Sequence, residues 1–303
     1  MIAAAGLIAS RFVHYAALMI LFGVAAFPVY NFRGNTPSLA AAAFLPWSRR
    51  VQIGAAAVAL ISGIFWLGFV ATTMSGEMSA LYDANILSLV IQTTDFGRVW
   101  MPRLGLIAVT LLLLVPKNPP EILRLAVLAA AAVALTSIAD TGHAGADNGP
   151  RAAIHITADA VHLSAAGIWI GALVVLSRMA LISARGLKPD DIKSFHHALE
   201  RFSAIGPVVV AALTLSGILN PGFLASLRTA YGQVLLAKLL LFGLMLLLAA
   251  ANRFWLTPRL ERAIDPKQPI GVLRASILAE TVLAVLVLSA VAWLGTLAPP
   301  AQG

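Results

Sequence analysis

The chain contains no cysteine among its 303 residues. Disulfide bonds, thiolate metal sites and iron–sulfur clusters are therefore excluded, because each of them is built on cysteine sulfur. A metal ion bound by this protein would have to use histidine, methionine, carboxylate or backbone oxygen ligands.

Two catalytic motifs are also missing. The sequence has no Gly-x-x-x-x-Gly-Lys-Ser/Thr loop, which excludes an ATP-driven pump that works by itself, because such a pump holds the nucleotide phosphates in that loop. It has no Gly-x-Ser-x-Gly nucleophile elbow either, and its intramembrane histidines have no positioned nucleophile beside them, which disfavours a hydrolase. We therefore expect that the protein is not an enzyme.

Charged residues are scarce: they make up 11% of the chain, against 60% hydrophobic residues, and the mean hydropathy is +0.89. These values lie outside the range of soluble globular domains. Apolar stretches that can cross about 30 Å of hydrocarbon recur along the whole chain. The composition therefore predicts an all-α, polytopic integral membrane helix bundle of about eight transmembrane helices. The predicted spans are 6–28, 51–72, 100–116, 121–139, 154–176, 203–219, 233–251 and 275–297.

The few cations are distributed unevenly between the predicted loops. The first, third, fifth and seventh loops hold 15 of the 21 lysine and arginine residues, and cytoplasmic loops of membrane proteins retain such an excess. Both termini are therefore predicted to face outward, on the periplasmic side. The net charge of +8 is explained by these inner loops, which meet anionic lipid of the bilayer, and it needs no nucleic acid as a partner.

The fifth predicted span carries a polar stripe. His155, Asp159 and His162 fall within about 60° of one helix face at about 100° per residue. A polar segment that contains His143 precedes this span. Ionisable groups inside a membrane are costly to bury and usually serve ion pathways or cofactor sites. These residues are therefore the first candidates for a functional site.

One further histidine and a methionine pair extend the candidate site. In the predicted topology His14 of the first span reaches the depth of His162, while Met74 and Met78 lie in the outer loop between spans two and three. Imidazole and thioether ligands together suit copper, and the thioether favours Cu(I). We therefore predict a copper site or pathway. Its candidate ligands are His14, His155, His162, Asp159, His143, Met74 and Met78.

Other interpretations of these residues stay open. The methionine pair is also typical of packing in an apolar protein, and His14 could bond a neighbouring backbone carbonyl instead of a metal. Asp159 orients a histidine in one interpretation and is neutralised by Arg11 of the first span in another.

Two groups near the inner face are assigned other roles. We expect Glu280 of the eighth span to meet Asn252 or Arg253, which end the seventh span. We expect His196 and His197 to lie in a charged inner loop with a solvated role.

The C-terminal half of the chain resembles a known family. The likeness runs from about residue 140 to the end and extends more loosely over the first four spans. The residues that carry it are Gly142-His143, the run Ala158-Asp159-Ala-Val-His162-Leu-Ser-Ala-Ala-Gly167-Ile-Trp169-Ile-Gly171, then Leu215-Ser-Gly217, Tyr231-Gly232, Lys238 and Ala251-Asn252-Arg253. This pattern is similar to the copper resistance D (CopD) family.

The resemblance implies an eight-span protein of the bacterial inner (plasma) membrane that handles copper, with import from the periplasm as the usual assignment. Members are commonly paired with a periplasmic copper-binding CopC protein, which here would be a separate chain, because no CopC-like domain is appended. We predict an N-terminal four-span region, 1–139, and a C-terminal CopD-like four-span region, 140–303, within one integrated membrane domain.

Two functions are compatible with these sequence features. The first is copper transport or delivery, in which outer methionine and histidine residues accept the ion and the deeper histidines pass it inward. The alternative is a membrane oxidoreductase that binds haem b, because histidines on facing helices can ligate haem axially in a bundle.

The charge distribution generates a test of topology. Single cysteines introduced at Ala146 and Ala184 of this cysteine-free chain should differ in labelling by an impermeant thiol reagent added to intact cells from outside, because 140–152 is predicted to be periplasmic and 177–202 cytoplasmic. Labelling of Ala146→Cys alone is expected. Equal labelling, or labelling of Ala184→Cys alone, would overturn the orientation.

Overall fold

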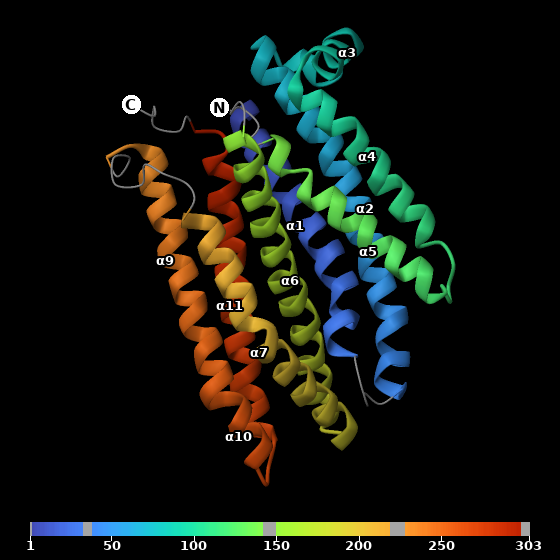
Figure 1. Cartoon of the computed structure of the whole chain (residues 1–303), viewed down its shortest axis with the longest axis vertical. Helices are drawn as coiled ribbons and strands as arrows, with labels where there is room; N and C mark the ends of the chain where they lie inside the picture. The colour runs from blue at the N-terminus through green and yellow to red at the C-terminus, as the bar shows by residue number, and fades with distance from the viewer. Residues whose placement is uncertain (1, 33–37, 142–149, 219–227, 298–303) are drawn as a thin grey trace.

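The computed structural model describes residues 2–32, 38–141, 150–218 and 228–297, and in these residues every regular element is a helix (Figure 1). The all-α membrane bundle predicted from composition is therefore confirmed. The long elements are α1 (Ile2–Asn31), α2 (Ser38–Ser75), α4 (Asp95–Leu113), α5 (Glu121–Thr136), α6 (Pro150–Gly186), α7 (Pro189–Ile218), α9 (Ala230–Ala251) and α11 (Lys267–Leu294). The short ones are η1 (Met78–Leu81), α3 (Ala84–Thr93), η2 (Ala139–Thr141), the π-helical turn η4 (Asn252–Leu256) and α10 (Thr257–Arg262).

Seven of the described helices are long and apolar enough to cross a membrane. The predicted fourth span is α5, whose 16 residues extend about 24 Å and fall short of about 30 Å of hydrocarbon. The positions of the chain ends show that α5 nevertheless counts as a pass through the bundle. Arg11 near the start of α1 donates to the carbonyl of Gly295, which follows α11. The two ends of the described chain therefore lie on the same side of the bundle, which requires an even number of passes.

Apart from α5, the spanning helices are longer than the apolar stretches that predicted them. Hydropathy marks only the part of a helix that lies in hydrocarbon, whereas the backbone hydrogen bonds continue into the interface. The clearest case is the predicted span 203–219, which is the second half of α7, a helix that begins at Pro189. His196 and His197 therefore lie on a helix and are half-buried, and the expected solvated inner loop is wrong for both.

The helix α1 lies between two halves of the bundle. On one side it packs with α2, α4 and α5 around Leu18, Leu21 and Leu135. On the other side it packs with α6, which belongs to a second hydrophobic cluster with α7, α9 and α11. Figure 1 shows α4 and α5 at one edge of the molecule and α9 at the other, with α1 and α6 between them. A polar group on α6 can therefore meet α7, α9 and α11, whereas a polar group on the other side of α1 meets α2, α4 and α5.

The contact between α1 and α6 is made by glycines. A Cβ added to Gly23 would lie closer than 3.0 Å to the backbone of Gly171, and one added to Gly171 would overlap the backbone of Gly23 in the same way. Gly167, four residues before Gly171, brings its carbonyl oxygen to the same point. Small residues four apart let two membrane helices approach until their backbones touch.

This contact predicts a strong dependence on a single methyl group. Gly171→Ala should lower the free energy of unfolding by about 1–3 kcal/mol, because the added carbon meets backbone, which cannot rotate away. The measurement is thermal unfolding of the purified protein in detergent. The matched control is Gly243→Ala in α9, where nothing lies within 4 Å of the added Cβ. Equal stability of the two variants would contradict the backbone contact.

Candidate functional site

His162 on α6 is held by a serine of α7. Its Nδ1 lies 3.0 Å from the Ser216 hydroxyl oxygen, and that hydroxyl donates its own proton to the Ala212 carbonyl one turn back on α7. The Ser216 oxygen is therefore an acceptor toward the imidazole, which places the ring proton on Nδ1. The lone pair then lies on Nε2, in the tautomer that a metal ligand needs.

A lysine and a tyrosine of α9 lie beside this histidine. Lys238 is within electrostatic reach of both His162 and Asp159, and Tyr231 is within reach of Asp159. The three helices α6, α7 and α9 thus enclose one polar group. The opposite charges of Lys238 and Asp159 offset each other, whereas burying either charge alone in a membrane would cost considerable free energy.

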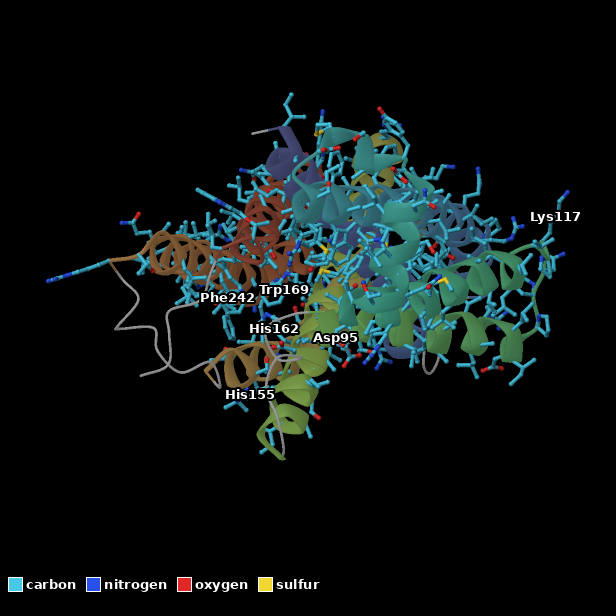
Figure 2. The ribbon with its side chains drawn as sticks, turned by 90° about the horizontal axis from the view of Figure 1, so that it is seen from above. Asp95, Lys117, His155, His162, Trp169 and Phe242 are labelled. Carbon is cyan, nitrogen blue, oxygen red and sulfur yellow. The ribbon has the colours of Figure 1, made fainter. Side chains whose placement is uncertain are left out.

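The predicted stripe on α6 follows from its geometry. The helix is continuous from Pro150 to Gly186, so His155, Asp159 and His162 share one face as the spacing indicates. All three are partly buried. Figure 2, a view from above, shows His155 and His162 in the same part of the bundle as Trp169, with Lys117 at the far side.

Aromatic rings lie below His162. The Trp169 ring, two turns further along α6, packs edge-on against Phe202 of α7 at 6.3 Å and against Phe242 of α9 at 6.2 Å between centroids. Trp169 is 3% exposed. The ring cluster therefore lies beyond His162 along α6, toward the end of the helix at Gly186.

His14 does not join the site around His162, although the sequence predicted that the two side chains lie at the same depth. Its Nδ1 is 2.9 Å from the Ala59 carbonyl and 3.3 Å from the Ser62 hydroxyl, both on α2, and its ring contacts Trp66 at 5.4 Å. The side chain is fully buried between α1 and α2. Within the described residues no group of three or more histidine, aspartate or glutamate side chains is arranged to hold a metal ion. His14 thus takes the carbonyl contact that the sequence left open, and the structure does not bring it together with His162.

Two arginines near His14 were not singled out as site residues. Arg103 of α4 is 1% exposed and donates from Nε and Nη2 to the hydroxyl and carbonyl of Ser137 at 2.8 and 2.7 Å. Its guanidinium lies 5.6 Å from the Trp66 ring, and that of Arg11 lies 5.6 Å from the same ring. The sequence placed Arg103 within an apolar run, and that position was the available signal.

The partner proposed for Arg11 is also different. Arg11 donates to the Gly295 carbonyl and, at 3.2 Å, to the Tyr15 hydroxyl, so it closes the end of α11. The alternative in which Arg11 neutralises Asp159 is therefore wrong, because the charge beside Asp159 comes from Lys238.

The outer candidate residues are exposed. Met74 in the last turn of α2 is 62% exposed, and Met78 in η1 is 45% exposed, so neither side chain packs into the protein core. His143 lies outside the described residues. At the inner side, the Asn252 amide donates to the Glu280 carboxylate, which confirms that expected contact, while Arg253 donates to the Ser203 carbonyl instead.

Known proteins match the chain along nearly its whole length. Residues 1–153 match the family described as copper resistance protein D-like, N-terminal domain, and residues 196–294 match copper resistance protein D. No solved structure matches the chain significantly.

Three curated relatives extend these matches. Copper resistance protein D of Pseudomonas syringae pv. tomato is 34% identical over 96% of both chains. Inner membrane protein YebZ of Escherichia coli is 34% identical over 96% of this chain and 98% of its own. Copper transport protein CutJ of Bacillus subtilis is 27% identical over 88% of this chain and 50% of its own. With both halves matched and full-length relatives at this identity, the chain belongs to the copper resistance protein D family.

Proposed function

We propose that the protein is a copper transport protein of the bacterial inner membrane, which passes copper from the periplasm toward the cytoplasm along α6. The observation that carries this proposal is the hydrogen bond of His162 Nδ1 to Ser216, because it leaves Nε2 as a metal-binding nitrogen inside the bundle. The names of two relatives, a copper resistance protein and a copper transport protein, support copper as the cargo.

The proposed path begins at the outer face. Met74 and Met78 are exposed there, and thioethers bind Cu(I) in preference to harder cations. We propose that they receive the ion from the periplasmic side, where a separate CopC-like carrier could deliver it. His155 then lies nearer the outer end of α6 than His162, and the two are separated by about 10 Å along the helix.

The charges beside His162 make the site responsive to a cation. Asp159 attracts a metal ion, whereas Lys238, which lies within electrostatic reach of Asp159, repels the ion. An arriving cation would compete with Lys238 for the carboxylate, so the site binds copper without holding it permanently, as a transport site requires. His14 has no place in this path and instead links α1 to α2 through the Ala59 carbonyl.

The test replaces the central ligand. His162→Ala should weaken copper binding by the purified protein by at least about tenfold, equivalent to about 1.4 kcal/mol, and should remove copper accumulation in cells. Insertion into the membrane should persist, because alanine lowers the cost of placing this segment in lipid. The measurements are metal content by mass spectrometry, the visible absorption spectrum and cellular copper.

Two control variants separate the roles. His197→Ala on α7 should leave copper binding unchanged. His14→Ala should lower the thermal stability of the protein but leave its copper affinity largely unchanged. Full copper binding and accumulation by His162→Ala at normal expression would refute the proposed path. Loss of a visible absorbance band on the same replacement would favour the haem b alternative.

A second test addresses entry. The double variant Met74→Leu/Met78→Leu should reduce cellular copper uptake at limiting copper and leave thermal stability unchanged, because both side chains are exposed and leucine preserves their volume. Uptake should recover when copper is in excess. Unchanged uptake at limiting copper would exclude the two methionines from the path.

A further inference from the structure

Glu280 is a carboxyl group buried near the middle of α11. It is 3% exposed, and it lies 13 positions after Lys267, where the helix begins. The side-chain amide of Asn252 donates to its Oε1. The indole N–H of Trp169 on α6 also faces the carboxyl group, although it is outside hydrogen-bonding geometry.

Cations near this carboxyl group are directed elsewhere. Arg253, next to Asn252, donates to the Ser203 carbonyl, Lys238 of α9 lies with Asp159 and His162, and Arg274 of α11 is exposed. Across the described part of the chain Glu280 forms no ion pair. An unpaired carboxylate in a low-dielectric interior costs several kcal/mol, and such a group usually becomes neutral by taking up a proton.

The backbone at Asn252 is also unusual. Asn252–Leu256 form a π-helical turn between α9 and α10, and single π turns inside α-helices often occur at functional sites. The turn is closed by the backbone N–H of Thr257, which donates to the Asn252 carbonyl. Thr257 therefore lies one turn beyond Asn252, the residue that donates to Glu280.

Two buried hydroxyl groups near this turn have no protein partner. Thr257 is 6% exposed, and its hydroxyl makes no hydrogen bond to the described residues. The same is true of the Ser276 hydroxyl, one turn from Glu280 on α11. Buried polar atoms without a protein partner are positions where water binds. Thr257 also lines a cavity of about 260 Å³ between α7 and α10, together with His196, Glu200, Arg253 and Glu261.

We propose that Glu280 is a proton-binding site, which holds a neutral carboxyl group and exchanges its proton with the inner aqueous side through Thr257 and this cavity. The step is a simple proton transfer. The carboxyl O–H bond breaks and a water molecule in the route accepts the proton, while Asn252 continues to donate to Oε1. The titratable groups of the cavity, His196, Glu200 and Glu261, relay the proton to solvent. The site does not depend on copper.

Infrared spectroscopy of the metal-free, full-length protein in lipid tests this proposal. A neutral carboxyl group has a carbonyl stretching band that shifts when its proton is exchanged for deuterium. At neutral pH this band should be present in the wild type and absent from Glu280→Gln, whose amide matches a neutral carboxyl group in shape. The control Glu121→Gln, at an exposed position in the first turn of α5, should keep the band. Identical spectra for the wild type and Glu280→Gln would overturn the proposal.

Two further variants test the surroundings. Asn252→Ala should move the band to higher frequency, because the carbonyl loses its donor, and this shift identifies Glu280 even if Glu280→Gln fails to fold. Thr257→Val, which replaces the hydroxyl with a methyl group of similar size, should slow deuterium exchange of the band at least about tenfold, or about 1.4 kcal/mol in the exchange barrier. An unshifted band in Asn252→Ala, or unchanged exchange in Thr257→Val, would count against the site or its route respectively.

Discussion

The arrangement of this bundle depends on the backbone contact between α1 and α6 at Gly23 and Gly171. In a membrane, lipid tails are as apolar as leucine, so helices associate through close packing and polar contacts rather than through the hydrophobic effect. Glycines allow that close packing, and α1 can then contact α2 and α5 with its other faces. The same contact turns the stripe of α6 away from α1, toward α7 and α9.

Two separate polar regions result from this division. Around Trp66, Nδ1 of His14 and two guanidinium nitrogens of Arg103 contact backbone carbonyls and serine hydroxyls, and Arg103 also lies over the aromatic ring, which is the pattern expected of groups that tie helices together. Around His162, the polar atoms come from three helices and include opposite charges. The second region has the chemistry of a binding site, since its partners are side chains that can exchange one contact for another.

The C-terminal half of the bundle contains polar groups at successive depths. His162 lies toward the end of the bundle where the two ends of the described chain meet, Trp169 and its aromatic neighbours follow, and Glu280 with Asn252 lies below them, above the cavity lined by Thr257 and Glu261. If copper and protons both use this half, the aromatic layer at Trp169 separates a metal-binding part from a proton-binding part. The family to which the chain belongs is named for copper, and the proton site is a property that the fold adds to it.

The amino-acid sequence alone determined the membrane class, the approximate positions of the eight predicted spans, the stripe on α6 and the contact of Glu280 with Asn252 or Arg253, of which the structure shows Asn252. Hydropathy and helical spacing are local properties, so they hold wherever a helix is placed, and the last contact follows because Asn252 and Glu280 occupy similar depths. The tertiary structure decided which helix each polar side chain meets. His14 and His162 have similar depths, yet one faces Ala59 and the other Ser216. Rotation of a helix about its axis is set by close packing against distant segments, and depth carries no information about it.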